Sequence, residues 1–227
     1  MRTIFIAGTD TGAGKTVFAA SLVWHLRSEG AEALGVKPFC SGGRADVKLL
    51  QEMQPGALSD EDVNPFYFPE AVAPLVSERK HRRKVVLADA MQRIDTVQRK
   101  CDVLIIEGSG GLLVPLGENF MVADLIRELK CELIIAARNR LGTINHTLLT
   151  VEAAKKVRPS IKVVLMDCGD RDESTGTNFR ILRQLLAPIS VVEYPFLGRK
   201  IKSAPSLRRG LQRRKRILQK VLARVLE

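Results

Sequence analysis

A glycine-rich segment near the start of the chain has the residues of a phosphate-binding loop. The sequence Gly8-Thr-Asp-Thr-Gly-Ala-Gly-Lys-Thr16 follows an apolar run and precedes a stretch with helical patterning. Glycines let backbone N–H groups turn toward phosphate oxygens, Lys15 adds a cation near the terminal phosphates, and Thr16 offers a hydroxyl to Mg²⁺. The segment predicts nucleoside triphosphate chemistry; the alternative is a glycine-rich turn with an incidental lysine. The residues expected around the nucleotide are Gly12, Ala13, Gly14, Lys15, Thr16 and Val17.

One irregularity marks this loop. Five residues separate Gly8 from Gly14 where the usual motif has four, so Thr9 stands at the first glycine position. The order of strand, loop and helix still favours the phosphate-binding interpretation.

Two acids are candidates for holding a magnesium ion. Glu107 ends the apolar run Leu104-Ile105-Ile106 and is followed by a glycine-rich turn. Mg²⁺ takes oxygen ligands, typically one or two carboxylates with waters and phosphate oxygens, and Asp46 is a second acid of the right type. The sequence therefore predicts a metal site of Thr16, Asp46 and Glu107. The alternatives are a solvated acid at a strand end for Glu107 and a helix N-cap for Asp46.

Lys37 is expected near the loop because it stands at the end of a predicted strand. Pro38 prevents that strand from continuing as a regular central strand, so the ammonium of Lys37 should lie at the same edge as Lys15. A solvated lysine is the alternative. Ser41, in Cys-Ser-Gly-Gly, is either a site hydroxyl or a turn residue.

A later helix start is a candidate anion site. Leu141-Gly142-Thr-Ile-Asn145 opens a helix directly after an apolar strand, and free N–H groups at such a start bind anions. A substrate carboxylate would fit there; an ordinary N-cap is the alternative.

Apolar runs alternate with helical patterns along most of the chain, which predicts an α/β fold. Runs without polar alternation suit strands buried on both faces, and the alternation implies a mostly parallel sheet with helices on both faces. The strands are expected at 3–7, 33–38, 102–107, 133–137, 162–166 and 190–194. The helices are expected at 16–27, 85–100, 121–130, 145–157 and 177–186. The less regular segment 40–83 is expected to cover the substrate at the carboxyl edge of the strands.

Charge is concentrated at the C-terminal end. Residues 199–227 contain eleven Lys and Arg and one acid, so they carry +10 of the net charge of +11. The chain is interpreted as one domain, residues 1–198, with a basic helical tail, residues 199–227. The nearly neutral domain means that the high pI says little about the substrate. Four scattered cysteines, with no Cys-x-x-Cys pair, and no signal or membrane-spanning run favour a cytoplasmic protein.

Five motifs together resemble the dethiobiotin synthetase family. They are Gly-Thr-Asp-Thr-x-x-Gly-Lys-Thr at 8–16, Val36-Lys37-Pro38 with Ser41, Asn64-Pro-Phe-x-Phe68, Glu107-Gly-x-Gly-Gly-x-x-x-Pro-Leu116 and Gly142-x-Ile-Asn-His-x-x-Leu-Thr150. The resemblance spans residues 1–198. It implies a P-loop NTPase-like fold and a homodimer that binds its substrate across the interface. It also implies Mg²⁺- and ATP-dependent closure of a cyclic urea on 7,8-diaminopelargonic acid with CO₂.

The resemblance also implies roles for individual residues. Lys15 and Lys37 would be catalytic, and Thr11 and Ser41 would contact phosphate or carbamate oxygens. The helix start at Leu141, Gly142 and Asn145 would hold the carboxylate of the fatty acid, from the partner subunit.

Two residues depart from the pattern of the family. Gly12 stands where an acid is common. Asp167 stands after the fifth strand of the fold, where the family tends to place an asparagine that contacts adenine, and a carboxylate accepts hydrogen bonds but donates none. Asp167 is therefore expected at the base, with the base preference open.

Other functions remain as alternatives. One is a nucleotide-switch ATPase of the partitioning and positioning type that reaches membrane or nucleic acid through an amphipathic basic tail. Another is a related ligase that acts on a different diamine. For the tail itself, a terminal helix that packs its leucines on the domain is favoured over contact with a membrane or nucleic acid.

Overall fold

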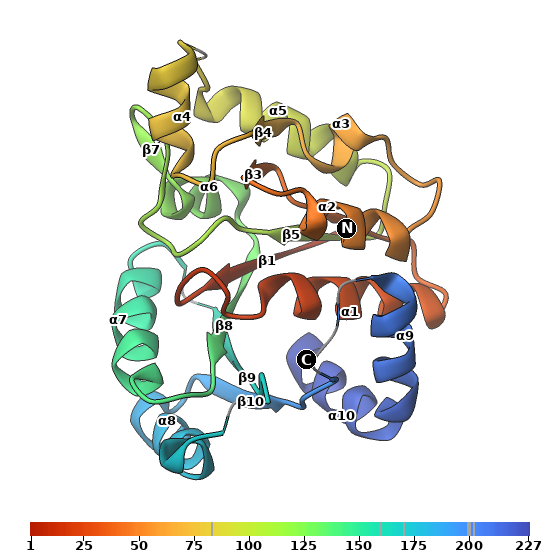
Figure 1. The fold of residues 1–227 in the computed structure, drawn as a ribbon, viewed down its shortest axis with the longest axis vertical. Coiled ribbons are helices and arrows are strands. Elements are labelled where there is room, and N and C mark those ends of the chain that lie inside the picture. Colours follow the sequence, from red (N-terminus) through yellow and green to blue (C-terminus); the bar gives the residue numbers. More distant parts are fainter. Residues whose placement is uncertain (83, 159, 170, 199–200, 202) are drawn as a thin grey trace.

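The fold is built around one parallel sheet. The computed structural model describes residues 1–82, 84–158, 160–169, 171–198, 201 and 203–227. The sheet has the spatial order β10-β9-β8-β1-β5-β2, and neighbouring strands are parallel (Figure 1). Its strands are β1 (Arg2–Gly8), β2 (Ala33–Val36), β5 (Val103–Glu107), β8 (Glu132–Arg138), β9 (Ile161–Met166) and β10 (Ser190–Tyr194).

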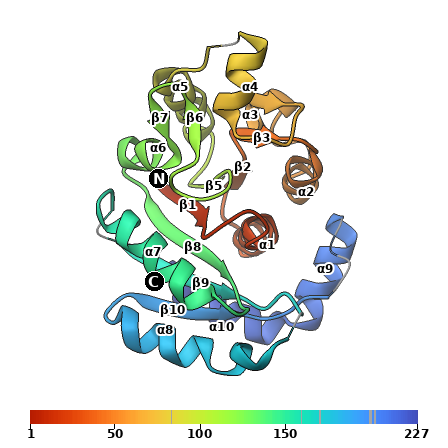
Figure 2. The ribbon, with the colours of Figure 1, turned by 60° about the vertical axis from the view of Figure 1, so that its left-hand side comes forward.

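Helices cover both faces of this sheet, as Figure 2 shows. One face packs against α5 (Leu87–Gln98), α6 (Val122–Leu129), α7 (Thr143–Lys155) and α8 (Asn178–Leu186). The opposite face packs against α1 (Lys15–Ser28), α2 (Ala45–Met53), α9 (Ala204–Arg213) and α10 (Lys215–Leu226). Strand β1 shows why its central residues 4–7 are all apolar: Ile4 and Ile6 enter one cluster and Phe5 and Ala7 the other. The predicted α/β fold is confirmed.

Smaller elements surround the carboxyl edge of the sheet. Strands β3 (Phe39–Ser41) and β4 (Phe66–Phe68) pair in parallel, and β6 (Pro115–Gly117) and β7 (Phe120–Met121) pair antiparallel. The short helices are α3 (Asp60–Val63), α4 (Pro74–His81) and the 3₁₀ helix η1 (Glu173–Gly176). Segment 40–83 thus contains more regular structure than the sequence predicted.

Several predicted boundaries were wrong for local reasons. The second strand ends at Val36 rather than Pro38, because the N–H of Lys37 donates to the carbonyl of Val63 outside the sheet. Helix α7 begins at Thr143, two residues before the prediction, because Gly142 caps it in the left-handed conformation at φ 88°. Asp46 is no N-cap: α2 begins at Ala45, so Asp46 lies inside its first turn.

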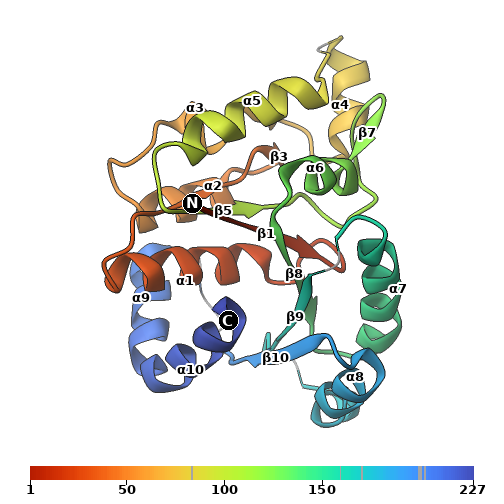
Figure 3. The same cartoon turned by 180° about the vertical axis from the view of Figure 1, so that it is seen from behind.

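The basic C-terminal segment packs against the domain. Its apolar residues Leu207, Leu211, Leu222 and Val225 are buried, and Figure 3 shows both of its helices alongside α1, with α10 also next to β10. The prediction of one continuous helix was wrong, because the chain breaks at Arg214 between α9 and α10. The cations Arg199, Lys200 and Lys202 lie outside the described residues. Across the described part of the chain, no helix has the length and apolar character to cross a membrane.

Candidate active site

The phosphate-binding loop lies at the switch point of the sheet. Strand β1 has β5 on one side and β8 on the other, and the loop leaves its carboxyl end. Ligands of open α/β sheets bind at such a crevice. A cavity of about 1060 Å³ opens there. The predicted site residues that line it are Thr11, Gly12, Gly14, Lys15, Thr16, Val17, Lys37, Ser41, Asp46 and Glu107. Ala13 is buried in the loop and does not line this cavity.

Glycines are required by the close packing of the loop. Gly14 has φ 95°, and a Cβ atom added at Gly8 would lie 2.9 Å from the backbone carbonyl oxygen of Asp10. The ammonium of Lys15 donates to the carbonyl of Asp10 at 3.0 Å, so the lysine is folded over the loop. The loop is therefore shaped for a ligand that its N–H groups and Lys15 contact together.

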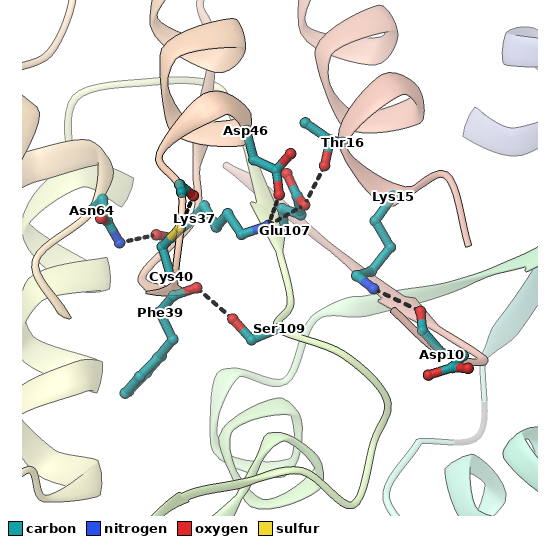
Figure 4. Close-up of polar contacts among 11 residues, drawn as sticks. Asp10, Lys15, Thr16, Lys37, Phe39, Cys40, Asp46, Asn64, Glu107 and Ser109 are labelled. Carbon is teal, nitrogen blue, oxygen red and sulfur yellow. Dashed lines mark hydrogen bonds and ion pairs between the residues drawn. The ribbon is translucent and has the colours of Figure 1, made fainter. Parts of the chain in front are cut away.

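Lys37 lies between two carboxylates in the same cavity, as Figure 4 shows. Its Nζ donates to Oδ2 of Asp46 at 2.5 Å and to Oε1 of Glu107 at 2.6 Å. Oγ1 of Thr16 donates to the same Oε1 of Glu107 at 2.7 Å. Lys37 and Glu107 are almost fully buried, whereas 43% of the Asp46 side chain is exposed. Residues from four separate segments thus form one connected polar cluster.

The two lysines experience different surroundings. Burial lowers the pKa of Lys15, and nearby Lys37 adds to the effect despite the opposing charge of Glu107. Burial also opposes charge on Lys37, but Glu107 and Asp46 outweigh it and raise the pKa of Lys37 above its ordinary value. Lys37 is therefore a permanent cation at physiological pH.

Two buried oxygens at the cavity have no hydrogen-bond partner in the described part of the chain. They are Oε2 of Glu107 and Oγ of Ser41. Buried polar atoms are usually paired, because an unpaired one costs about 1–3 kcal/mol. A ligand or ion that satisfies both oxygens would remove this cost.

Comparison with known proteins decides the family. Residues 2–198 match the family model described as an AAA domain. The chain is 41% identical over 162 residues to the ATP-dependent dethiobiotin synthetase BioD of Bacillus velezensis, covering 69% of this chain and 70% of that protein. It is 38% identical over 185 residues to BioD of Bacillus subtilis strain 168, covering 78% and 80%. The chain belongs to the ATP-dependent dethiobiotin synthetase family. It is therefore an ATP-dependent ligase that forms carbon–nitrogen bonds.

More distant similarity concerns the fold alone. The structure of apo McdA from Cyanthece superposes with a TM-score of 0.59 at 14% identity and full coverage of both chains. The basic segment 199–227 lies outside the residues that match the family model.

Two residues that support the site were not among the predicted site residues. Asn64 donates from Nδ2 to the carbonyls of Lys37 and Pro38, at 2.8 and 3.2 Å, and thereby fixes the backbone that carries Lys37. Ser109 donates from Oγ to the carbonyl of Phe39. Asn64 opens one of the motifs that carried the family resemblance, which was the signal that could have identified it. Ser109 stands at an unspecified position of another motif, so the sequence offered no signal for it.

The helix start that was predicted to bind a carboxylate lies apart from the large cavity. Leu141 and Asn145 are exposed, and Oδ2 of Asp172 accepts from the N–H of Leu141 at 2.8 Å. The neighbouring Thr143 lines a cavity of about 40 Å³ on the other side of the loop. Leu141, Gly142 and Asn145 therefore do not reach the loop cavity of their own subunit.

Asp167 lies farther along the carboxyl edge of the sheet. It directly follows β9 and lines cavities of about 510 and 260 Å³, neither of which is the loop cavity. Its Oδ1 accepts from the N–H of Gly169 at 2.8 Å, and its Oδ2 lies 3.6 Å from Nη2 of Arg171.

Proposed function

We propose that this chain closes a cyclic urea on 7,8-diaminopelargonic acid with CO₂ and ATP, yielding dethiobiotin, ADP and phosphate. The observation that carries the proposal is the cluster of Lys37 with Asp46, Glu107 and Thr16 beside the loop lysine, in one cavity. A triphosphate, a carboxylated amine and a divalent cation are the ligands that such a set of charges suits. The names of the similar proteins support the same reaction.

Magnesium suits the oxygens of Thr16, Asp46 and Glu107. They supply a hydroxyl and two carboxylates, and Oε2 of Glu107 is a buried acceptor with no partner among the described residues. Such hard oxygen donors are those that Mg²⁺ selects. When bound, the ion would neutralise charge on the triphosphate.

The two lysines would favour the first chemical step, capture of CO₂ by a substrate amine. A free alkylamine has a pKa of about 10.4, so at neutral pH it is mostly protonated and not nucleophilic. Lys15 and Lys37 are buried cations at the cavity, and nearby cations lower the pKa of an amine while stabilising a carbamate anion. The attacking nitrogen loses its proton as the carbamate forms.

The same cations would serve the remaining steps. A carbamate oxygen attacks the γ-phosphorus and ADP leaves, which gives a carbamic–phosphoric anhydride. The second amine then attacks the carbonyl carbon, the bond to the phosphate oxygen breaks, and the ring closes. Lys15 and Lys37 would stabilise charge on the transferred phosphoryl group. Ser41, whose Oγ lacks a described partner, and Thr11 at the rim would donate to its oxygens.

A homodimer would complete the substrate site. Helix α7 begins outside the loop cavity of its own subunit, and large apolar side chains lie exposed just before it and on it: Leu141 is 78% and Leu149 63% exposed. Exposed apolar side chains of this size are typical of a protein interface. In such a dimer, Leu141, Gly142 and Asn145 of one subunit would hold the carboxylate of a fatty acid bound by the other.

Phosphate release from MgATP, with and without 7,8-diaminopelargonic acid and bicarbonate, tests the proposal. Release should require both additions, and Lys37→Ala should abolish it while the circular dichroism spectrum stays native. Lys155→Ala, which removes an exposed ion pair with Glu152, is the matched control and should retain full activity. A Lys37→Ala variant with undiminished release would contradict the assigned role. Release that responds to another diamine, or to lipid vesicles or DNA instead, would contradict the proposed substrate.

A further inference from the structure

The end of strand β9 connects the phosphate-binding loop to a second region of the carboxyl edge. A Cβ atom added at Gly14 would lie 3.0 Å from the side chain of Met166, so this methionine packs directly on the loop. Asp167 is the next residue. Strand β9 lies two strands from β1, which is roughly 10 Å at the ordinary strand spacing. A nucleotide with its phosphates on the loop would place its sugar and base over this distance, toward Asp167.

Two carboxylates, which accept hydrogen bonds, lie in the region around Asp167. Asp167 and Glu193 line the same cavity of about 510 Å³, and Pro195 contributes an apolar wall. Burial, and then the charge of Asp167, raise the pKa of Glu193, so the negative charge of Asp167 acts on Glu193. One oxygen of Asp167 accepts from Gly169, and among the described residues the other has Arg171 alone, at 3.6 Å. The second oxygen therefore retains the capacity to accept from a ligand.

Cations stand next to this acceptor. Arg171 and Arg214 line the adjoining cavity of about 260 Å³ together with Asp167. Arg214 lies at the break between α9 and α10, so the basic C-terminal segment reaches the region where the base is expected. The site thus offers a carboxylate acceptor and guanidinium donors side by side.

The two purines present different edges to such a site. Guanine carries two adjacent donors, N1–H and the N2 amino group, beside the acceptor O6. Adenine carries one amino donor beside the unprotonated N1, whose lone pair would face the second oxygen of a carboxylate. The carboxylate itself therefore accepts two hydrogen bonds from guanine and one from adenine, and a neighbouring arginine can donate to O6 of guanine.

We propose that Asp167 makes the base site of this chain accept guanine, so that GTP serves as phosphoryl donor alongside ATP. The inference rests on the proposed function, because the activity assay that tests it measures diamine-dependent phosphate release. In the bound state, Asp167 would accept from N1–H and the N2 amino group of guanine, and Arg171 or Arg214 would donate to O6.

The experiment compares ATP and GTP in the wild type and in Asp167→Asn. The measured quantity is kcat/KM for diamine-dependent phosphate release with each nucleotide. Wild type should give a value with GTP at least one third of that with ATP; a lower ratio would overturn the proposal. Asp167→Asn, which replaces one acceptor oxygen with a donor, should shift the ratio at least about tenfold toward ATP, the size of effect expected for a bidentate contact. A shift of less than that would also overturn it.

Equilibrium binding separates this inference from the proposed function. Titration with fluorescent GDP and ADP analogues needs no turnover, and the affinity ratio should move in the same direction in Asp167→Asn. Glu173→Gln removes an exposed acid from the neighbouring η1 and is the charge-matched control, which should leave both ratios unchanged. Binding of GDP within threefold of ADP that shifts toward ADP in Asp167→Asn, with no diamine-dependent release, would reject the proposed function alone. ATP-driven release with a GTP ratio below one third would reject only the assignment of Asp167.

Discussion

Replacing Lys37 with methionine removes the cation that lies between the carboxylates of Asp46 and Glu107. Breaking a buried ion pair by deleting one partner costs about 3–5 kcal/mol, because the remaining charge is left buried without compensation. Glu107 is 1% exposed and incurs this cost, whereas Asp46 is 43% exposed and is largely solvated when left alone. We therefore expect a loss of about 3 kcal/mol in the free energy of unfolding.

Urea unfolding followed by fluorescence of the single tryptophan, Trp24, measures this change. For a chain of this size, the loss corresponds to a decrease of roughly 6–12 °C in Tm. The double variant Lys37→Met with Glu107→Gln should cost at least about 1 kcal/mol less than the sum of the single variants, because the unpaired charge is gone. Lys155→Met breaks an exposed pair and should cost less than about 1 kcal/mol. A Lys37→Met variant as stable as Lys155→Met, with no coupling to Glu107, would refute the reasoning.

The other predictions concern the metal ligands, a thiol and the C-terminal helices. Thr16→Val should lower diamine-dependent turnover at least about 100-fold and raise the Mg²⁺ concentration needed for half-maximal rate, which a magnesium titration measures; an unchanged titration would exclude Thr16 as a ligand. Burial raises the pKa of Cys131 to about 11, so its thiol should resist Ellman's reagent at pH 9 in the folded protein while Cys168 reacts. Because an unfolded thiol ionises near its ordinary pKa of 9.0, this group should also reduce stability as the pH rises above 9, and a Cys131→Ala variant should lose that part of the pH dependence. Leu211→Ala leaves a cavity beneath α9 and should cost about 2–5 kcal/mol by urea unfolding; a cost near zero would show that the C-terminal helices contribute no stability.

The central strands could be predicted from the sequence because each is buried on both faces. Runs such as Ile4–Ala7 supply apolar side chains to both clusters, and no polar alternation competes with that interpretation. The positions of the loop and of Glu107 in the site could also be predicted from the sequence, because the carboxyl ends of parallel strands meet at one edge of the sheet.

Contacts between segments far apart in the chain could not be predicted from the sequence. The bond of Asn64 to the carbonyl of Lys37 joins residues 27 apart, and neither residue type indicates the other. The break at Arg214 has a similar origin: the apolar periodicity of 207–225 suits one helix, but both halves bury their leucines against the domain only if the chain turns. Tertiary burial outweighed local periodicity there.

Incorporation of isotopically labelled carbon tests the central claim most directly. The protein would be incubated with MgATP, 7,8-diaminopelargonic acid and ¹³C-bicarbonate, and the products analysed by mass spectrometry. Our account predicts dethiobiotin that carries a single ¹³C atom, in the urea carbonyl, with one phosphate released per molecule formed. Phosphate release without a labelled dethiobiotin, or no reaction of this diamine at all, would contradict it.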